Sequence, residues 1–295
     1  MISMFKLISW GYLHGFSNLL RKLKYKIKIK NLKNIKKEAI TNTSLTDSSL
    51  YIGYPSFCAT AAGDEKVFSE FRSYKEIIDV LDHVTVEQAR KYLEEIERYS
   101  NWNTDFTLAL NHIDSLGKPF SYKFNQGIFS PTSIRYLKTF LEIRYLFGDL
   151  KDYNIIEIGV GFGGQAAIFQ LLSNPKSYSL YDLMSTLNLA RNFLGQLNLD
   201  ANIISYDGTN PQPGINSPDL IISNYAFSEL NREIQDKYLE NIILKSPKGY
   251  ITWNCLSHEK LNGYSLADLV RIIPKAEIIP EVPNTHLSNA IIIWK

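Results

Sequence analysis

Four glycines stand where an apolar run gives way to a helical pattern. The stretch NIIEIGVGFGGQAAIF covers residues 154–169 and contains Gly159, Gly161, Gly163 and Gly164. Glycine lets the backbone approach a ligand closely, and a helix that starts there offers unpaired N–H groups. The pattern therefore predicts a nucleotide-type ligand at a strand-to-helix turn. A tight turn that binds nothing is the alternative.

Acidic and amide side chains lie at the ends of the neighbouring apolar runs. Glu157 precedes the first glycine by two positions, and the later runs SYSLYDL, ANIISYD and PDLIISN contribute Asp182, Asp207 and Asn224. A carboxylate after a second strand can accept hydrogen bonds from ribose hydroxyls. One after a third strand can meet an adenine amino group. The spacing predicts a nucleoside ligand with Asp182 at its ribose and Asp207 at its adenine.

Seven strand-length apolar runs alternate with helical stretches over the second half of the chain. They cover residues 154–160, 177–183, 201–207, 218–224, 249–255, 276–282 and 289–295. This alternation is typical of a parallel sheet covered by helices. Only PNTHLS separates the last two runs, which is too short for a parallel crossover. We therefore expect an α/β, Rossmann-like, seven-stranded mixed sheet with an antiparallel last strand and helices on both faces.

A helical region precedes the predicted sheet. DHVTVEQARKYLEEIERY contains Thr85 and Gln88 at capping-box spacing, and a second helix is expected to begin at Pro131 and to end at Gly148. We predict three regions: residues 1–63 as an amphipathic, basic segment with a Ser/Thr/Asn/Gly-rich linker over 38–63, residues 64–150 as a helical cap or a substrate or oligomerisation region, and residues 151–295 as the catalytic domain.

From about residue 130 to 295 the chain resembles class I S-adenosylmethionine-dependent methyltransferases. The resemblance rests on the successive motifs EIGVGFGG, LYDL, SYDG and DLIISNYAFSEL. It implies S-adenosyl-L-methionine as the cofactor, with the loop of Gly159, Gly161 and Gly163 at its methionine part, Asp182 at the ribose and Asp207 by the adenine. We add Glu157, Asn224 at the strand exit and Arg135 to the expected cofactor-binding set. A guanidinium can clamp the methionine carboxylate, although a surface salt bridge explains Arg135 equally well.

A narrower resemblance, to bacterial sugar O-methyltransferases, rests on SPTSIRYLKTFLEI and SNYAFSELNREIQDKYLENII. It implies methylation of a hydroxyl on a sugar or a sugar-containing metabolite, in a surface polysaccharide pathway. Three alternatives stay open: another small-molecule acceptor, an NAD(P)-dependent oxidoreductase, and a binding module without activity. An oxidoreductase would have a sixth parallel strand and no C-terminal hairpin.

An alcohol acceptor requires removal of its proton, and the base must lie on a loop at the carboxyl ends of the strands. Three side chains meet that condition: Glu229 after the fourth strand, His258 after the fifth and His286 between the last two. His258 is the preferred base. Glu229 is also explained as a helix cap, and an isolated surface histidine is usually inert.

Composition narrows the expectations for disulfides, metal sites, location and partners. Two distant cysteines and five scattered histidines predict neither disulfides nor a metal site, and the cytoplasm fits best. Residues 1–37 hold ten basic side chains and no acid, against 22 basic and 30 acidic residues in the remainder. With its amphipathic start, this segment is expected to dock on the protein itself or on a second subunit. Peripheral contact with the inner membrane is the alternative, and no nucleic-acid partner is expected.

Overall fold

The computed structural model describes residues 53–214, 217–254 and 261–295, which all belong to one compact unit, Glu38–Lys295. The expectations for residues 1–37 and for His258 therefore lie outside the described residues. None of the described helices is both long enough and apolar enough to cross a membrane.

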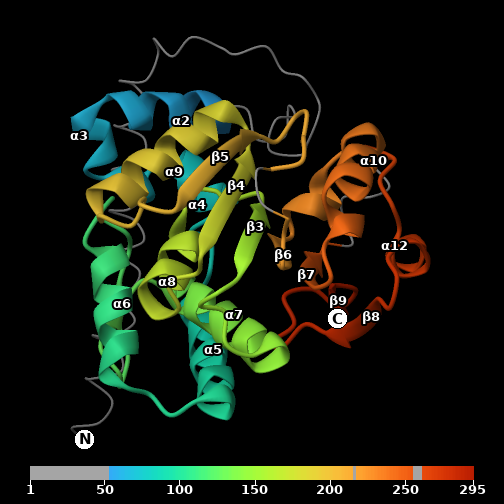
Figure 1. Cartoon of the computed structure of the whole chain (residues 1–295). Helices are drawn as coiled ribbons and strands as arrows, with labels where there is room; N and C mark the ends of the chain where they lie inside the picture. Colours follow the sequence, from blue (N-terminus) through green and yellow to red (C-terminus); the bar gives the residue numbers. More distant parts are fainter. Residues whose placement is uncertain (1–52, 215–216, 255–260) are drawn as a thin grey trace, which may run out of the picture. The chain divides into compact units, whose positions relative to one another are not determined.

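Seven strands form the central sheet (Figure 1). They are β3 (Asn154–Ile158), β4 (Ser177–Asp182), β5 (Ile203–Asp207), β6 (Leu220–Asn224), β7 (Gly249–Trp253), β8 (Glu277–Pro280) and β9 (Ala290–Trp294). Their order is β5-β4-β3-β6-β7-β9-β8. Neighbours from β5 to β7 pair in parallel, whereas β9 is antiparallel to both β7 and β8. The predicted α/β fold is confirmed, and the antiparallel β9 argues against the dinucleotide oxidoreductase alternative.

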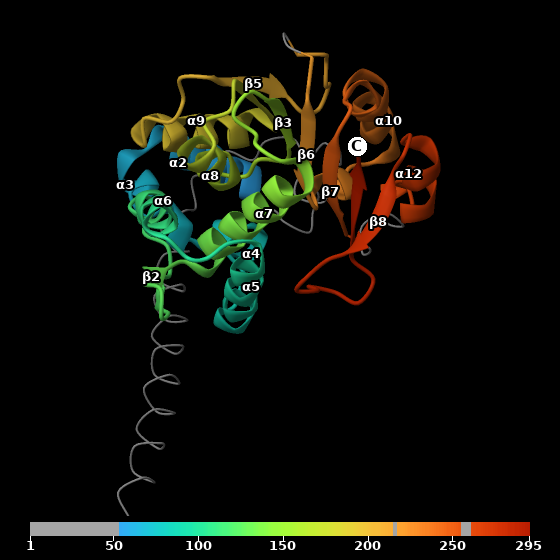
Figure 2. The ribbon, with the colours of Figure 1, turned by 60° about the horizontal axis from the view of Figure 1, so that its bottom comes forward.

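The sheet separates two hydrophobic cores because successive side chains of a strand point to opposite faces. Ile155 packs in the core with the helices α7 (Pro131–Phe147), α8 (Gly164–Leu172) and α9 (Met184–Gln196). Ile156 packs in the core with α10 (Arg232–Asn241) and α12 (Leu266–Ile272). Figure 2 shows these two sets of helices on opposite sides of the sheet. Helices on both faces were predicted and are confirmed.

A further layer of short elements covers α7, α8 and α9. Its members are α2 (Tyr54–Gly63), α3 (Glu65–Phe68), η2 (Phe71–Ser73), α4 (Lys75–Val80), α5 (Val86–Tyr99), α6 (Thr104–Asp114) and the hairpin of β1 (Tyr122–Lys123) and β2 (Ile128–Phe129). Single 3-10 turns follow β6 and α10, namely η3 (Ala226–Glu229) and η4 (Ile243–Lys245). This layer belongs to the same compact unit as the sheet, so residues 64–150 are not a separate body.

Two helices of this region follow their sequence signals. Thr85 caps α5: its hydroxyl accepts from the Gln88 N–H at 3.1 Å, and the Gln88 side chain accepts from the Thr85 N–H at 2.9 Å. Helix α7 begins at Pro131 and ends at Phe147, and Gly148, which has a φ of +85°, caps it. The predicted capping box and both helix ends are therefore present.

The linker prediction for residues 38–63 is wrong over its last ten residues. Tyr54–Gly63 forms α2, and Phe57, Cys58 and Ala61 of this helix are buried without exposure. The side chain of Asn192 on α9 donates to the carbonyl of Ala62 at 3.1 Å. Small and polar residues obscured the apolar face here, although Pro55 is a helix-start signal.

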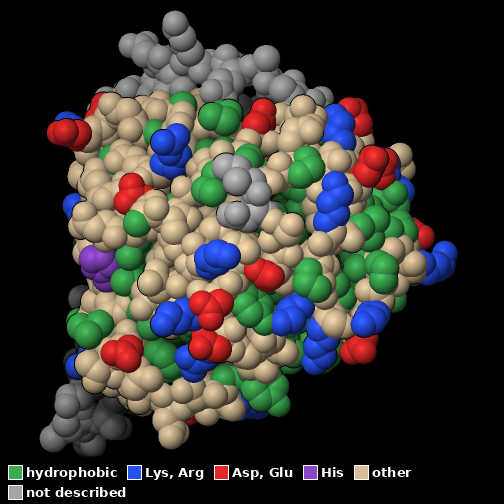
Figure 3. Space-filling model, in the orientation of Figure 1, with side chains coloured by type: hydrophobic (Ala, Val, Ile, Leu, Met, Phe, Trp, Pro, Cys, Tyr) green, Lys and Arg blue, Asp and Glu red, His purple; other side chains and the backbone are tan. Residues whose placement is uncertain are grey.

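One face of the described chain carries mixed charges (Figure 3). On the face in Figure 3, basic and acidic side chains lie among one another instead of separating into broad areas of one sign.

Candidate active site

A cavity of about 490 Å³ lies at the carboxyl ends of the parallel strands. The sheet order places it at the topological switch point, because the chain proceeds from β3 to β4 and β5 on one side and then returns to β6 on the other. Open α/β sheets bind ligands at this point. The volume lies in the usual range for small-molecule sites. The cavity is therefore the candidate active site.

The glycine turn forms part of the cavity floor. Gly159, Gly161 and Gly163 have φ values of +77°, +54° and +89°, which other residues rarely adopt. A Cβ on Gly159 would lie 1.9 Å from the Cβ of Ala226, and one on Gly161 would lie 2.9 Å from the Leu81 methyl groups. The space beside these glycines is thus filled by the protein itself. Gly159 and Gly161 line the cavity, whereas Gly163 packs against α9.

Asp182, at the end of β4, joins the glycine turn to the next strand. One carboxylate oxygen accepts the N–H groups of Val160 at 2.7 Å and Gly161 at 3.2 Å, and the other accepts that of Leu183 at 2.7 Å. Burial raises the pKa of Asp182 to about 6, while these backbone hydrogen bonds lower it. The carboxylate is therefore ionised near neutral pH and lines the cavity at the turn, as expected for a group that accepts from ribose hydroxyls.

Two predicted cofactor ligands do not line this cavity. Glu157 shares its face of β3 with Ile155, and its carboxyl group accepts the hydroxyl of Tyr178 at 2.8 Å within the core. Asp207 is exposed at the end of β5 and accepts from the N–H and hydroxyl of Thr209. Gly208 and Thr209 line the cavity in its place.

The exit of β6 presents Asn224 and Tyr225 to the cavity. Tyr225 has a φ of +69°, and such strained backbone is often found at ligand sites. Its hydroxyl donates to the buried carboxylate of Glu281, which also accepts from the N–H and hydroxyl of Thr285. Because Thr285 belongs to the turn between β8 and β9, this carboxylate ties that turn to the exit of β6. The turn then forms one wall of the cavity.

Glu229 lies farther along the same loop and meets Asn254 at the end of β7. The Asn254 amide donates to the Glu229 carboxyl group at 2.8 Å. Ser228, which is fully buried, accepts the Asn254 N–H at 2.9 Å and donates to the carbonyl of Tyr225, so it joins the two strand exits. Burial raises the pKa of Glu229 to about 7. A carboxyl group with this pKa at the cavity wall suits a general base.

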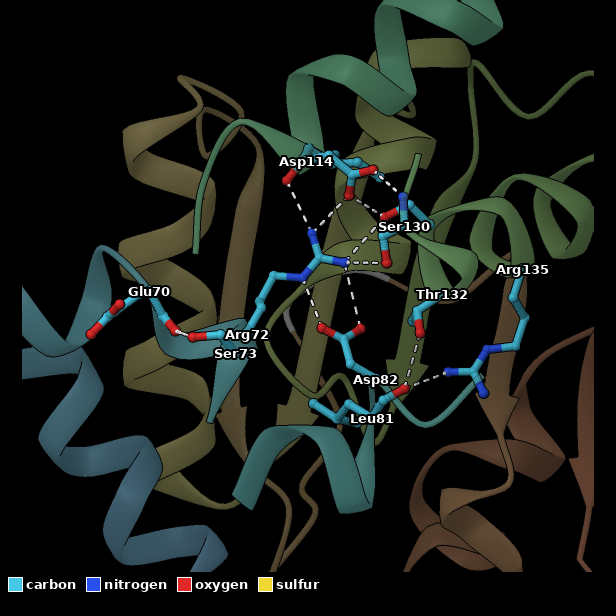
Figure 4. A network of polar contacts seen from close by, with 11 residues as sticks. Glu70, Arg72, Ser73, Leu81, Asp82, Asp114, Ser130, Thr132 and Arg135 are labelled. Carbon is cyan, nitrogen blue, oxygen red and sulfur yellow. Dashed lines mark hydrogen bonds and ion pairs between the residues drawn. The ribbon is translucent and has the colours of Figure 1, made fainter. Parts of the chain in front are cut away.

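Arg135 reaches the cavity from the second turn of α7. Its guanidinium donates to the carbonyl of Leu81 at 3.4 Å and lies 5.5 Å from the ring centre of Tyr136 (Figure 4). Among the described residues no ion pair joins it to a carboxylate, so the alternative of a surface salt bridge is not observed. A guanidinium that lines a cavity in this way is suited to an incoming anion.

Asp82, the residue after Leu81, is bound by a second arginine, which is fully buried (Figure 4). The Arg72 guanidinium donates to both carboxylate oxygens of Asp82, at 3.0 and 3.5 Å, and to Asp114 at 2.9 Å. It also donates to the hydroxyls of Ser130 and Ser133 at the start of α7. The network therefore connects the segment next to Leu81 with the helix that carries Arg135.

Of the two histidines proposed as bases, only His286 belongs to the described residues. His286 is exposed, lines the cavity, and accepts the N–H of Ser288 at 3.3 Å. His258 lies outside the described residues. His83 also lines the cavity, and the desolvation by the cavity walls and the charge of Arg135 lower its pKa, although one edge stays exposed. His83 carried no sequence signal because it stands in the connection between α4 and α5.

Tyrosines complete the site and were missed from the sequence. Tyr54 of α2 and Tyr92 of α5 are nearly buried and both line the cavity. Tyr92 stands directly before the buried Leu93 on α5, so its orientation depends on how α5 packs against α7. Among the described residues no cluster of histidine, cysteine, aspartate or glutamate could hold a metal ion.

Comparisons with known proteins find similarity in fold only. No protein-family model and no curated protein matches the chain. A variant of MtNAS in complex with S-adenosylmethionine is 13% identical, the match covering 82% of this chain and 90% of that one at a TM-score of 0.42. PigF with SAH is 12% identical, and the match covers 74% of this chain and 72% of that one at a TM-score of 0.40. TrmK of M. capricolum in complex with SAH is 15% identical, and the match covers 48% of this chain and 61% of that one at a TM-score of 0.34. Likeness of this degree establishes neither a family nor an activity for the chain.

Proposed function

We propose that this protein is an S-adenosylmethionine-dependent O-methyltransferase whose acceptor is a hydroxyl of a sugar or of a sugar-containing metabolite. The observation that carries the proposal is one cavity at the switch point of the sheet. Its walls hold Asp182, which is bonded to the glycine turn, and Glu229, which titrates near neutral pH. This pairing supports a nucleoside ligand and proton removal in the same place.

The residues present fit the cofactor in three respects. Asp182 is ionised near neutral pH and can accept from ribose hydroxyls beside the glycine turn. Gly208 and Thr209 follow β5, at the expected adenine end. The Arg135 guanidinium has no carboxylate partner among the described residues and can receive the methionine carboxylate.

When bound, the cofactor supplies an electrophilic methyl group on a sulfonium centre. The acceptor oxygen would take this methyl group, with the sulfur as the leaving group. In this proposal Glu229 takes the hydroxyl proton, and Asn254 orients the Glu229 carboxyl group. The walls from α4, α5 and the β8–β9 turn hold the acceptor in line and keep water out, which accounts for a large part of the acceleration.

A polar acceptor suits the remaining side chains of the cavity. Amide and hydroxyl groups come from Asn224, Asn254, Thr285 and Asn289. The rings of Tyr92 and Tyr225 offer aromatic surface beside them. The hydroxyls of a sugar ring can hydrogen-bond to the amide and hydroxyl groups, and its apolar face can pack on the aromatic rings. This supports the sugar acceptor that the sequence resemblance implies.

The first test is calorimetric titration with S-adenosylhomocysteine. We expect micromolar binding that becomes at least about tenfold weaker in Asp182→Ala, because a hydrogen bond to a charged group contributes about 1.5–3 kcal/mol. Asp152→Ala, at an exposed site, is the matched control and keeps the affinity of the unmodified protein. Thermal unfolding checks that each variant is folded. Folded, unmodified protein that does not bind S-adenosylhomocysteine refutes the proposal.

A further inference from the structure

The first residue of α2 lies at the ribose end of the candidate site. Tyr54 is 4% exposed and lines the same cavity as Asp182 and Leu183. It belongs to neither the sheet nor its connecting loops. No motif of the glycine turn or of the strand ends includes it.

The position of Tyr54 follows from how two helices pack. Helix α9 begins at Met184, two residues after Asp182, and α2 lies alongside it (Figure 1). Late in both helices, the Asn192 side chain donates to the Ala62 carbonyl. Because Tyr54 is also close to Thr186 in the first turn of α9, the two helices run in the same direction, and the first residue of α2 lies beside the start of α9. Three fully buried residues keep α2 in this place: Phe57, Cys58 and Ala61.

The chemistry of Tyr54 suits a bound nucleoside. Burial, then the nearby Cys58 and Asp182, raise the pKa of its hydroxyl well above 10, so the group stays protonated at neutral pH, and the side chains of Cys58 and Thr186 lie within hydrogen-bonding reach of it. Asp182 already accepts three backbone N–H groups and is acceptor-only when ionised. A ribose has hydroxyls that both donate and accept. Asp182 and Tyr54 together supply the matching acceptor and donor.

We propose that Tyr54 is a cofactor-binding residue that closes the cavity over the ribose and donates its hydroxyl hydrogen bond there. This inference rests on the proposed function and places part of the cofactor site on α2, outside the sheet and its loops.

The test compares two ligands with the same thioether and nucleoside, S-adenosylhomocysteine and 5′-methylthioadenosine. Only the first has the amino-acid end. We expect Tyr54→Phe to weaken the binding of both about threefold to tenfold, the effect of one hydrogen bond. Arg135→Met, at the other end of the site, is expected to weaken S-adenosylhomocysteine alone. Tyr74→Phe is the matched control, because Tyr74 packs on Phe57 but does not line the cavity.

Each outcome has a distinct meaning. Tyr54→Phe keeps the ring, so an unchanged melting temperature shows that α2 stays packed. If this variant binds both ligands within about twofold of the unmodified protein, the inference is wrong while the proposed function stands. If it weakens only S-adenosylhomocysteine, Tyr54 contacts the amino-acid end and the inference is also wrong. If the unmodified protein binds neither ligand, the proposed function itself fails.

Discussion

Two carboxyl groups in one cavity differ because their partners differ. Asp182 accepts three backbone N–H groups, which hold its pKa near 6 against the effect of burial. Glu229 has one amide donor, Asn254, and burial raises its pKa to about 7. Distinct environments of this kind separate an ionised binding group from a group that exchanges protons. This difference supports the proposal that Asp182 binds the cofactor and that Glu229 removes the proton.

This assignment predicts the behaviour of Glu229→Gln. Because the amide cannot accept a proton, methyl transfer should fall by about 10²- to 10⁴-fold, whereas S-adenosylhomocysteine binding should stay unchanged. In the unmodified protein the active base is deprotonated, so the rate should rise as the pH increases through about 7 and then level off. Initial rates of methyl transfer to a sugar acceptor between pH 5.5 and 9 measure this.

Glu233→Gln is the control, because Glu233 is exposed and pairs with Lys237 on α10. It should keep both the rate and the pH profile. A Glu229→Gln protein with unchanged turnover would transfer the role of base to His286 or His258.

At the scale of the element, the period of the strand decides the environment of Glu157. Side chains of β3 alternate between the two cores, and this alternation places Glu157 on the side of α7 and α8, bonded to Tyr178. Burial raises its pKa to about 8, and the hydrogen bond from Tyr178 lowers it. The carboxyl group is thus a buried, largely protonated side chain beneath the glycine turn.

The raised pKa of Glu157 predicts a pH-dependent stability. Between about pH 4.5 and 8 the unfolded chain loses this proton while the folded chain keeps it, so the contribution of Glu157 to stability falls as the pH rises. Glu157→Gln keeps an acceptor for Tyr178 and cannot ionise. Its melting temperature relative to the unmodified protein should therefore increase by at least about 2 °C from pH 5 to pH 8.5.

Thermal unfolding of both proteins at the two pH values measures this difference. Glu240→Gln, at an exposed site on α10, should show none. A difference for Glu157→Gln that is the same at pH 5 and pH 8.5 would mean that Glu157 is ionised in the folded protein.

At the scale of the whole molecule, Arg72 connects three parts of the chain. Its guanidinium bonds Asp82 before α5, Asp114 at the end of α6 and Ser130 before α7 (Figure 4). Because Leu81 and Arg135 lie next to these partners, the network fixes one wall of the cavity as well as the packing of the helical layer. A site on the sheet thus depends on residues far from it in sequence.

Removing Arg72 should be costly. Arg72→Met leaves the carboxylates of Asp82 and Asp114 nearly buried without their cation, and breaking a buried ion pair costs about 3–5 kcal/mol. The free energy of unfolding from urea denaturation measures the loss. Lys237→Met removes an exposed pair on α10 and should cost no more than about 0.5 kcal/mol. A loss for Arg72→Met as small as the control would show that the network does not hold the layer in place.

Local patterns were sufficient for most of the elements. The seven apolar runs became the seven strands, and Thr85, Pro131 and Gly148 marked helix ends where the structure has them. Each of these signals depends on neighbours a few residues away, such as a cap or a two-residue period. The antiparallel β9 also followed from the sequence, because a six-residue connection cannot cross over.

The sequence by itself determined the sheet, the turn of glycines, the position of Asp182 at a strand end and that of Glu229 in the loop after β6, because these depend on chain direction and spacing. Only the tertiary structure decided that Glu157 faces the core, that Ala226 and Leu81 fill the space beside the glycines, and that Tyr54, His83 and Tyr92 join the site. Those outcomes depend on how separate helices pack against one another, and contacts between residues distant in sequence leave no periodic signal along the chain.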